Sequence, residues 1–294
     1  MRATPGEMAD SIRRQVFGCH RATDKEPSLT EEIVPAKHFQ VGSMRVEVHP
    51  TSNAAGAAAA QAAANTLIKL AKTHDSIGVI FATGASQMET LRELTGAANL
   101  PWNKIRGLHM DEYVGIAADH PASFRRYLRE RLTEKVKMRT FLEIDGSTED
   151  PERTGREYAD EIRSADPQLC LLGIGENGHL AFNDPPIADF ADPRDVKIVE
   201  LDAACRQQQT AEGWFGSVEQ VPQYAITLTI PALFRVPRLI VSVPGRRKAK
   251  IVRRAFTEPI STGCPATILR THPDATVYLD LESADELDGV LVSQ

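Results

Sequence analysis

The stretch Leu169-Cys-Leu-Leu-Gly-Ile-Gly-Glu-Asn-Gly-His-Leu-Ala-Phe-Asn-Asp-Pro185 contains the strongest indications of the fold. Its apolar beginning, residues 169–173, is typical of a buried strand. The glycines that follow permit close backbone approach and unusual dihedral angles. His179 and Asp184 add an imidazole and a carboxylate, and a nearby carboxylate can orient a histidine and raise its basicity. We therefore expect a strand that ends in a loop equipped for acid/base chemistry, and a structural histidine is the alternative.

Outward from this stretch, short apolar runs alternate with helical patterns. The predicted strands are residues 44–48, 77–81, 105–110, 141–144, 169–173, 196–201, 239–243 and 276–281. The predicted helices are residues 54–72, 87–94, 123–132, 151–164 and 248–256. This alternation predicts an α/β fold, a three-layer Rossmann-like domain whose mostly parallel sheet carries helices on both faces. In such sheets ligands bind at the carboxyl ends of the strands.

The composition fits a soluble globular enzyme. The chain has 294 residues, is 42% hydrophobic and 25% charged, and carries a formal net charge of -6, so nucleic acid is not expected as a partner. Residues 1–40 are weakly patterned and are predicted to be a partly irregular N-terminal extension. Residues 41–294 are expected to form one catalytic domain.

The cysteines and apolar runs indicate the compartment. Four scattered cysteines, with no CxxC pair, favour free thiols in a reducing environment over a disulfide framework or a zinc knuckle. No apolar run approaches the ~18 residues of a membrane span, and no apolar signal core follows the first basic residues. We expect a cytoplasmic protein that does not associate with membranes.

A second chemical segment lies between a predicted strand and helix at residues 81–88. Its turn contains Thr83, Gly84, Ala85 and Ser86. Backbone N–H groups exposed at such a turn suit a phosphate, and two hydroxyls add donors. The alternative is a plain turn in which Ser86 caps the helix, and the segment is not a Walker loop.

The third segment, residues 107–115, places Asp111 and Glu112 after a strand. Neighbouring residues of an extended chain point to opposite sides, so at most one of these carboxylates should face a ligand. Such a carboxylate would be placed to act as a general base, and an acidic loop is the alternative.

A fourth segment, residues 243–250, repeats the order of strand, turn and helix and contains Lys248. A cation near a helix start is disfavoured by the helix dipole, and an anionic ligand would offset that penalty. Metal binding is a competing interpretation for His179, Asp184, Asp111 and His109. Because their spacing matches no metal motif, we expect no metal and no other cofactor.

Taken together, these segments resemble the glucosamine-6-phosphate deaminase family, within the superfamily that includes 6-phosphogluconolactonases and ribose-5-phosphate isomerases. The resemblance covers residues 46–287. The matching motifs are Thr83-Gly-Ala-Ser86, Met110-Asp-Glu-Tyr-Val-Gly115, His120-Pro-Ala-Ser123, Gly173-Ile-Gly-Glu-Asn-Gly-His179, Ala181-Phe-Asn183, Val221-Pro-Gln-Tyr-Ala-Ile-Thr227, Gly245-Arg-Arg-Lys-Ala249 and Cys264-Pro-Ala266.

The resemblance implies a mechanism. The phosphate of an amino-sugar phosphate would bind the turn from Thr83 to Ser86, with Arg206 and Lys248 as cationic partners. His179, with Asn177 and Asp184 beside it as further catalytic residues, would help to open the sugar ring. Asp111 would carry a proton between C2 and C1. The products would be ammonia and a ketose phosphate, most simply fructose 6-phosphate from glucosamine 6-phosphate.

Three features of this sequence depart from the family pattern. Asp184 stands where glutamate is common, which shortens the reach toward His179 by one methylene. Asn177 stands where some members have aspartate. Residues 186–194 lack the Ser/Thr-rich, basic character of regulated members, which argues against allosteric activation.

Three other functions are left open: a galactosamine-6-phosphate deaminase, a 6-phosphogluconolactonase-like hydrolase and a non-catalytic sugar-phosphate sensor. The lactonase pattern would have an Asp-Glu-Arg segment and a His-Thr-Ala-Ser run, which are absent here. A pure sensor has no need of the base that Asp111 supplies. Whether the chain forms a homo-oligomer is also left open.

Overall fold

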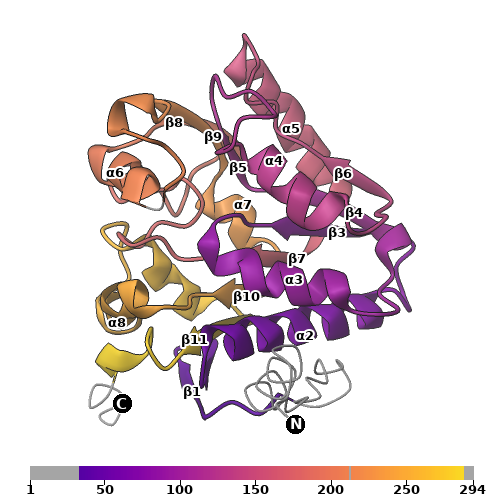
Figure 1. Cartoon of the computed structure of the whole chain (residues 1–294), viewed down its shortest axis with the longest axis vertical. Coiled ribbons are helices and arrows are strands. Elements are labelled where there is room, and N and C mark those ends of the chain that lie inside the picture. The colour runs from indigo at the N-terminus through magenta and orange to yellow at the C-terminus, as the bar shows by residue number, and fades with distance from the viewer. Residues whose placement is uncertain (1–32, 212, 288–294) are drawn as a thin grey trace, which may run out of the picture. The chain divides into compact units, whose positions relative to one another are not determined.

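The computed structural model describes residues 33–211 and 213–287, and these are built around an eight-stranded sheet (Figure 1). Its order is β1-β2-β11-β10-β7-β3-β4-β6, and every neighbouring pair except β1 and β2 is parallel. The strands are β1 (Lys37–Val41), β2 (Met44–His49), β3 (Ile77–Phe81), β4 (Ile105–His109), β6 (Thr140–Leu142), β7 (Pro167–Leu172), β10 (Arg238–Ser242) and β11 (Ala275–Asp280). The predicted mostly parallel sheet is confirmed.

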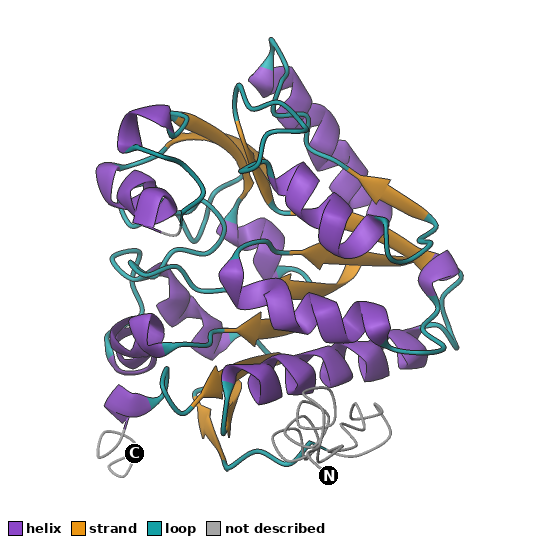
Figure 2. Cartoon of the chain, in the orientation of Figure 1, coloured by secondary structure: helices purple, strands orange, loops and turns teal. Residues whose placement is uncertain are grey.

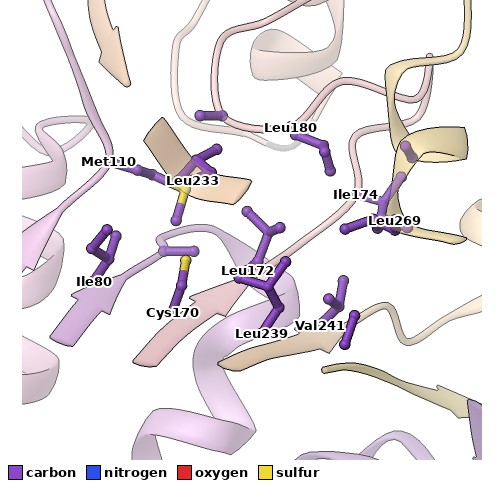
Figure 3. Close-up of a cluster of buried hydrophobic side chains, with 14 of the residues drawn as sticks. Ile80, Met110, Cys170, Leu172, Ile174, Leu180, Leu233, Leu239, Val241 and Leu269 are labelled. Carbon is purple, nitrogen blue, oxygen red and sulfur yellow. The ribbon is translucent and has the colours of Figure 1, made fainter. Parts of the chain in front are cut away.

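Helices cover both faces of this sheet, as predicted (Figure 2). Helices α2 (Ser52–Leu70) and α3 (Met88–Gly96) lie side by side on one face. On the other face are α5 (Pro151–Ala165), α7 (Ile230–Phe234) and α8 (Ala249–Thr257). Figure 3 shows the core of this second face, where Leu172 and Leu239 of the strands lie among buried residues such as Leu233 of α7.

The alanine-rich sequence of α2 explains its position. Buried alanines line most of the helix, and Thr51 caps its start by accepting a hydrogen bond from the Ala54 amide. A side chain at Gly56 would place its Cβ 2.5 Å from the Cβ of Glu89, so α2 and α3 approach each other closely there. Small residues thus allow two helices to pack over the same strands.

A second sheet, of three antiparallel strands, stands beside the first. It has the order β5-β9-β8, from β5 (Asp111–Tyr113), β9 (Tyr224–Leu228) and β8 (Val196–Glu200). Residues 196–201 were expected as a strand, but β5 and β9 were not. Their pairing joins segments far apart in sequence, for example Asp111 with Thr227, and β5, with only three residues, has no local signal of its own.

The remaining elements agree with prediction to within a few residues. Residues 123–132 form α4 (Phe124–Leu128) followed by a π-helical turn, η3 (Arg129–Thr133), instead of one helix. Helices α6 (Ala203–Ala211) and α7 (Ile230–Phe234) were not predicted. Residues 1–32 of the expected extension lie outside the described residues, and β1 joins the sheet before residue 40.

Within the described residues, no helix is both long and apolar enough to cross a lipid bilayer. Three cysteines there, Cys170, Cys205 and Cys264, are buried free thiols, as expected, and Cys19 lies outside the described residues.

Candidate active site

A pocket of about 420 Å³ opens at the carboxyl ends of the central strands. The chain runs outward from β3 to β4 and β6, then returns with β7 on the other side of β3. The strand order therefore reverses between β3 and β7, which is where ligands bind in open α/β sheets. All four predicted segments contribute to the lining, with the predicted residues Thr83, Gly84, Ala85, Ser86, Asp111, His179 and Lys248 among them.

Two similar turns form one side of the pocket. Gly84 follows β3 with φ 91° and ψ 175°, and Gly245 follows β10 with φ 92° and ψ 148°. Both lie in a conformation that is essentially restricted to glycine. Each leads through a 3₁₀ turn, η1 (Ala85–Gln87) or η5 (Arg246–Lys248), into a helix. Backbone N–H groups of such turns suit an anionic ligand.

Buried polar residues hold these turns in place. Gln87, which the sequence did not single out, donates to the carbonyl of Leu172 at the end of β7 (3.1 Å) and to Ser86 Oγ (3.2 Å). Asp280, at the end of β11, accepts from the Gly245 amide at 3.0 Å and from the Ser52 hydroxyl. The turn after β10 is thereby fastened to the start of α2.

Lys248 lies where its segment predicted, at the N-cap position of α8. Its Nζ donates to the carbonyl oxygen of Ile174 at 2.9 Å, which holds the ammonium at the pocket wall. A cation at this position compensates an anion bound between the two turns.

His179 forms a hydrogen-bonded pair with Asp184. Its Nδ1 lies 2.9 Å from Asp184 Oδ1, which also accepts from the Asn177 amide at 2.7 Å. The side-chain oxygen of Asn177, Oδ1, accepts a hydrogen bond from the His179 backbone amide at 3.0 Å. The shorter aspartate therefore reaches His179. A Cβ at Gly175 would lie 2.2 Å from the ring, so only glycine leaves room for the imidazole.

The electrostatics of this pair favour an ionised Asp184. Burial raises the pKa of Asp184, but the hydrogen bonds and charge of His179, together with Asn177, outweigh burial and leave that pKa below its usual range. An ionised carboxylate accepts a hydrogen bond from the Nδ1–H group, which leaves Nε2 to exchange a proton with a ligand. Asp184 and Asn177 thus act behind His179, since neither is among the residues that line the pocket.

Asp111 and Glu112 point to opposite sides of β5, as expected. Asp111 lines the pocket and is 6% exposed. Burial, and then the negative charge of Glu112, raise the pKa of Asp111 well above its usual range. A carboxyl group with a raised pKa is suited to both accepting and releasing a proton near neutral pH.

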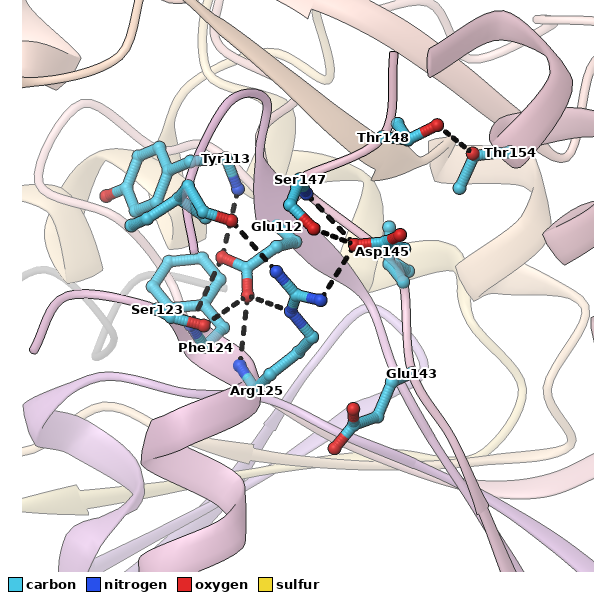
Figure 4. A network of polar contacts seen from close by, with 12 residues as sticks. Glu112, Tyr113, Ser123, Phe124, Arg125, Glu143, Asp145, Ser147, Thr148 and Thr154 are labelled. Atoms are coloured by element: carbon cyan, nitrogen blue, oxygen red, sulfur yellow. Dashed lines mark hydrogen bonds and ion pairs between the residues drawn. The ribbon is translucent and has the colours of Figure 1, made fainter. Parts of the chain in front are cut away.

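Glu112 is buried in a network of donors (Figure 4). Its carboxylate accepts from Ser123 Oγ at 2.8 Å and from the backbone amides of Tyr113, Phe124 and Arg125 at 3.0–3.1 Å. The Arg125 guanidinium lies 3.5 Å from it and also binds Asp145. Glu112 therefore fixes the start of α4 against β5 and has no access to the pocket.

Arg206, expected as a partner of the phosphate, is placed differently. It is not among the lining residues, and its Nη2 donates to the carbonyls of Val218 (2.6 Å) and Val221 (3.2 Å). The guanidinium thus satisfies backbone carbonyls around η4 (Val218–Gln220). Its role in phosphate binding stays a prediction.

One group of side chains could hold a metal ion. Donor atoms of His179, Asp184 and Cys205 lie within 4.8 Å of one another. The other two residues considered from the sequence, Asp111 and His109, are not in this group. Burial lowers the pKa of His109 to about 3, and its Nε2 accepts from the Ile144 amide at 2.7 Å, so it serves as a structural histidine.

The far side of the pocket was missed by the sequence analysis. Its lining includes Phe124 and Phe182, together with Gln209 of α6 and Trp214 of the turn after α6. Tyr113 supports this wall, with its ring 5.0 Å from Phe124 and 5.2 Å from Phe182. Phe182 lies within the motif Ala181-Phe-Asn183 and Phe124 directly follows His120-Pro-Ala-Ser123, but no motif marked Gln209 or Trp214.

Comparison with known proteins agrees with this geometry. A family model described as glucosamine-6-phosphate isomerases/6-phosphogluconolactonase matches residues 50–278. A glucosamine-6-phosphate deaminase of Exiguobacterium sibiricum is 32% identical over 220 residues, which are 72% of this chain and 82% of that protein. A glucosamine-6-phosphate deaminase of Geobacillus sp. (strain WCH70) is 32% identical over 230 residues, 76% of this chain and 89% of that protein.

Solved structures give the same result. A monomeric glucosamine-6-phosphate deaminase superposes with a TM-score of 0.74 at 29% identity, covering 82% of this chain and 99% of that chain. A 6-phosphogluconolactonase of Thermotoga maritima superposes with a TM-score of 0.66 at 20% identity, covering 81% and 99%. The second likeness concerns the fold alone.

Proposed function

Because the chain belongs to the family of glucosamine-6-phosphate isomerases and 6-phosphogluconolactonases, we propose that it is an enzyme that converts glucosamine 6-phosphate to fructose 6-phosphate and ammonia. The main observation behind this proposal is that Asp111 and His179 line the same pocket, with Asp184 hydrogen-bonded behind His179. The same pocket also contains the two glycine turns suited to an anion. A hydrolysis without isomerisation would not require a carboxyl group with the properties of Asp111.

Substrate binding is assigned to the two glycine turns. The phosphate binds at the turns that follow Gly84 and Gly245, where the Gly245 amide itself donates to Asp280, and Lys248 is its counter-charge. This places the sugar carbons toward Asp111 and His179. Holding the phosphate at one end converts proton transfer at the other end into an intramolecular step.

The chemistry then takes three steps. His179 Nε2 moves a proton between the ring oxygen and the C1 hydroxyl, which opens the ring, and Asp184 stabilises the imidazolium that forms. Asp111 takes the proton from C2, which gives an enolamine, and returns it to C1. One proton passes from the amino nitrogen to the C1 oxygen, so that the aminoaldehyde becomes a ketimine at C2. Water adds to the ketimine carbon, ammonia leaves, and the ketose phosphate remains.

The test is ammonia release from glucosamine 6-phosphate by the purified chain. Galactosamine 6-phosphate and 6-phosphogluconolactone serve as parallel substrates. We expect ammonia from the first, and no release from either amino sugar would refute the proposal. Asp111→Asn should abolish turnover and leave binding of glucosamine 6-phosphate largely intact, because the variant keeps the shape of the site and loses only the base.

A further inference from the structure

Gln209 of α6 has a buried carboxamide at the pocket. The residue is 7% exposed, lines the pocket, and its Oε1 accepts a hydrogen bond from Tyr113 Oη at 2.7 Å. Tyr113 is fully buried among aromatic rings on β5. A side chain whose oxygen is held by a buried hydroxyl has a fixed orientation, so its amide nitrogen is fixed as well.

The amide nitrogen of Gln209 faces the open space of the pocket. Among the residues that the structure describes, it has no hydrogen-bond partner. It is not fully buried, and the residue lines the pocket. An oriented N–H donor that the fold leaves unused favours a ligand that presents an acceptor to it, since burying it against an apolar ligand surface would be unfavourable.

The position of Gln209 indicates which part of the ligand it contacts. Tyr113 lies two residues after Asp111, so both side chains leave β5 on the same side. Cys205, one helical turn before Gln209, lies beside His179 and Asp184. Gln209 therefore lies near the catalytic groups. A carboxamide N–H donates to oxygen and cannot donate usefully to an ammonium group.

We propose that Gln209, oriented by Tyr113, is a specificity-determining residue that donates a hydrogen bond to a hydroxyl or carbonyl oxygen of the sugar chain. This inference rests on the proposed function for the identity of the substrate. Trp214, whose backbone amide donates to the Gln209 carbonyl at 3.1 Å, adds an apolar surface for the C–H face of the sugar. Together they distinguish a sugar phosphate from phosphate alone.

The test compares Gln209→Met, which keeps the length of the side chain and removes both polar groups, with Gln209→Glu, which keeps an acceptor for Tyr113 and removes the donor. The dissociation constants for glucosamine 6-phosphate and for inorganic phosphate are measured by calorimetry, and kcat/KM by ammonia release. Circular dichroism and the melting temperature establish that each variant is folded.

We expect both variants to bind glucosamine 6-phosphate about tenfold more weakly. Gln209→Met should bind inorganic phosphate as the wild type does, and the phosphate comparison uses this variant because Gln209→Glu adds a carboxyl group to an anion-binding pocket. Tyr113→Phe should weaken sugar-phosphate binding less, because it frees the carboxamide without removing it. If the role of Gln209 were purely structural, Gln209→Glu would bind glucosamine 6-phosphate as the wild type does. Gln209→Met would then weaken the binding of phosphate and of sugar phosphate alike.

The two proposals fail differently. If the wild type releases ammonia and both Gln209 variants keep their affinity and kcat/KM within twofold, the role of Gln209 is refuted and the function stands. If the wild type binds glucosamine 6-phosphate without releasing ammonia, and the variants bind it about tenfold more weakly, the function is refuted and Gln209 stands. No binding of the sugar phosphate by the wild type would refute both.

Discussion

Replacing Glu112 with glutamine tests how the fold and the reaction are connected at β5. The carboxylate accepts four hydrogen bonds and neighbours the Arg125 guanidinium (Figure 4). Glutamine keeps one oxygen, which can still accept from the Tyr113 and Phe124 amides. Its NH₂ group then faces Ser123 Oγ and the Arg125 amide, both of which are donors to the wild-type carboxylate.

The expected loss of stability follows from these contacts. Hydrogen bonds to a charged acceptor contribute about 1.5–3 kcal/mol each. The bond from the Arg125 amide is replaced by a contact between two donors, and the bond from Ser123 by a neutral one in which the hydroxyl accepts. Part of this loss is offset, because burial raises the pKa of Glu112 and the variant no longer buries a charge. Glu112→Gln should therefore lower the free energy of unfolding by about 2–4 kcal/mol, a large share of the ~5–15 kcal/mol typical of a domain.

The same substitution should change the pH dependence of the reaction. The negative charge of Glu112 is the second cause, after burial, of the raised pKa of Asp111. Removing that charge lowers the pKa of Asp111, although burial keeps it above its usual range. Because the proposed reaction needs Asp111 as an ionised base, the acidic limb of the kcat/KM profile should move to lower pH in Glu112→Gln.

Two measurements check this prediction: urea unfolding at pH 7 and the pH profile of ammonia release. The matched control is Glu130→Gln, an exposed carboxylate paired with Arg126, which should change neither result. If Glu112→Gln does not fold, Ser123→Ala is the milder variant. It removes the bond to Glu112 and the N-cap bond from the Arg126 amide, and should cost about 1–3 kcal/mol. An unchanged urea midpoint together with an unmoved acidic limb would show that Glu112 does not act as described.

Three further substitutions test the site. Gly84→Ala should lower the free energy of unfolding by about 1–3 kcal/mol and raise KM, because φ 91° and ψ 175° strain any residue other than glycine. The strain is in the backbone alone, since the added Cβ meets nothing within 4 Å. The control is Gly96→Ala in helix α3, which should be neutral or stabilising by up to about 1 kcal/mol in the same thermal unfolding assay. Asp184→Asn should lower the melting temperature most at neutral pH. The lowered pKa of Asp184 gives stability above its unfolded pKa of about 3.9, and this is lost as the pH falls through the folded value, so the deficit should shrink in acid. Lys248→Met should raise KM with little effect on kcat, because the ammonium contacts a group that does not react, and an equal fall in kcat would contradict this.

The sequence predicted the central sheet because its strands carry their own signal. Fully buried strands such as β3 read as unbroken apolar runs, and Gly84 and Gly245 mark the turns that follow two of them. Parallel strands end at one edge, so these turns were bound to meet there. The opposite directions of Asp111 and Glu112 followed from the alternation of an extended chain alone.

The remaining parts depend on contacts that no local pattern reveals. β5 is a strand only because β9 pairs with it from more than a hundred residues away along the chain. Arg206 was assigned to the phosphate by resemblance, but an arginine on a helix is equally satisfied by nearby carbonyls, and those of Val218 and Val221 were within reach. Gln209, on helix α6, was overlooked because its significance comes from its hydrogen bond with Tyr113, which lies on strand β5.

Strand β5 shows why stability and activity should be difficult to separate in this protein. Its three residues alternate in direction, so Asp111 and Tyr113 leave toward the pocket and Glu112 leaves toward α4. The pocket side supplies the proposed base and the support of the proposed sugar contact, and the opposite side supplies the network that holds the strand. Because the charge on one side raises the pKa of the base on the other, any change that relaxes the network should also retune the base. Variants at Glu112, Ser123 and Arg125 should therefore lose stability and also shift the acidic limb of the pH profile. Because variants of Ser123 leave the charge of Glu112 in place, they should lose stability with a smaller shift of the acidic limb than Glu112→Gln.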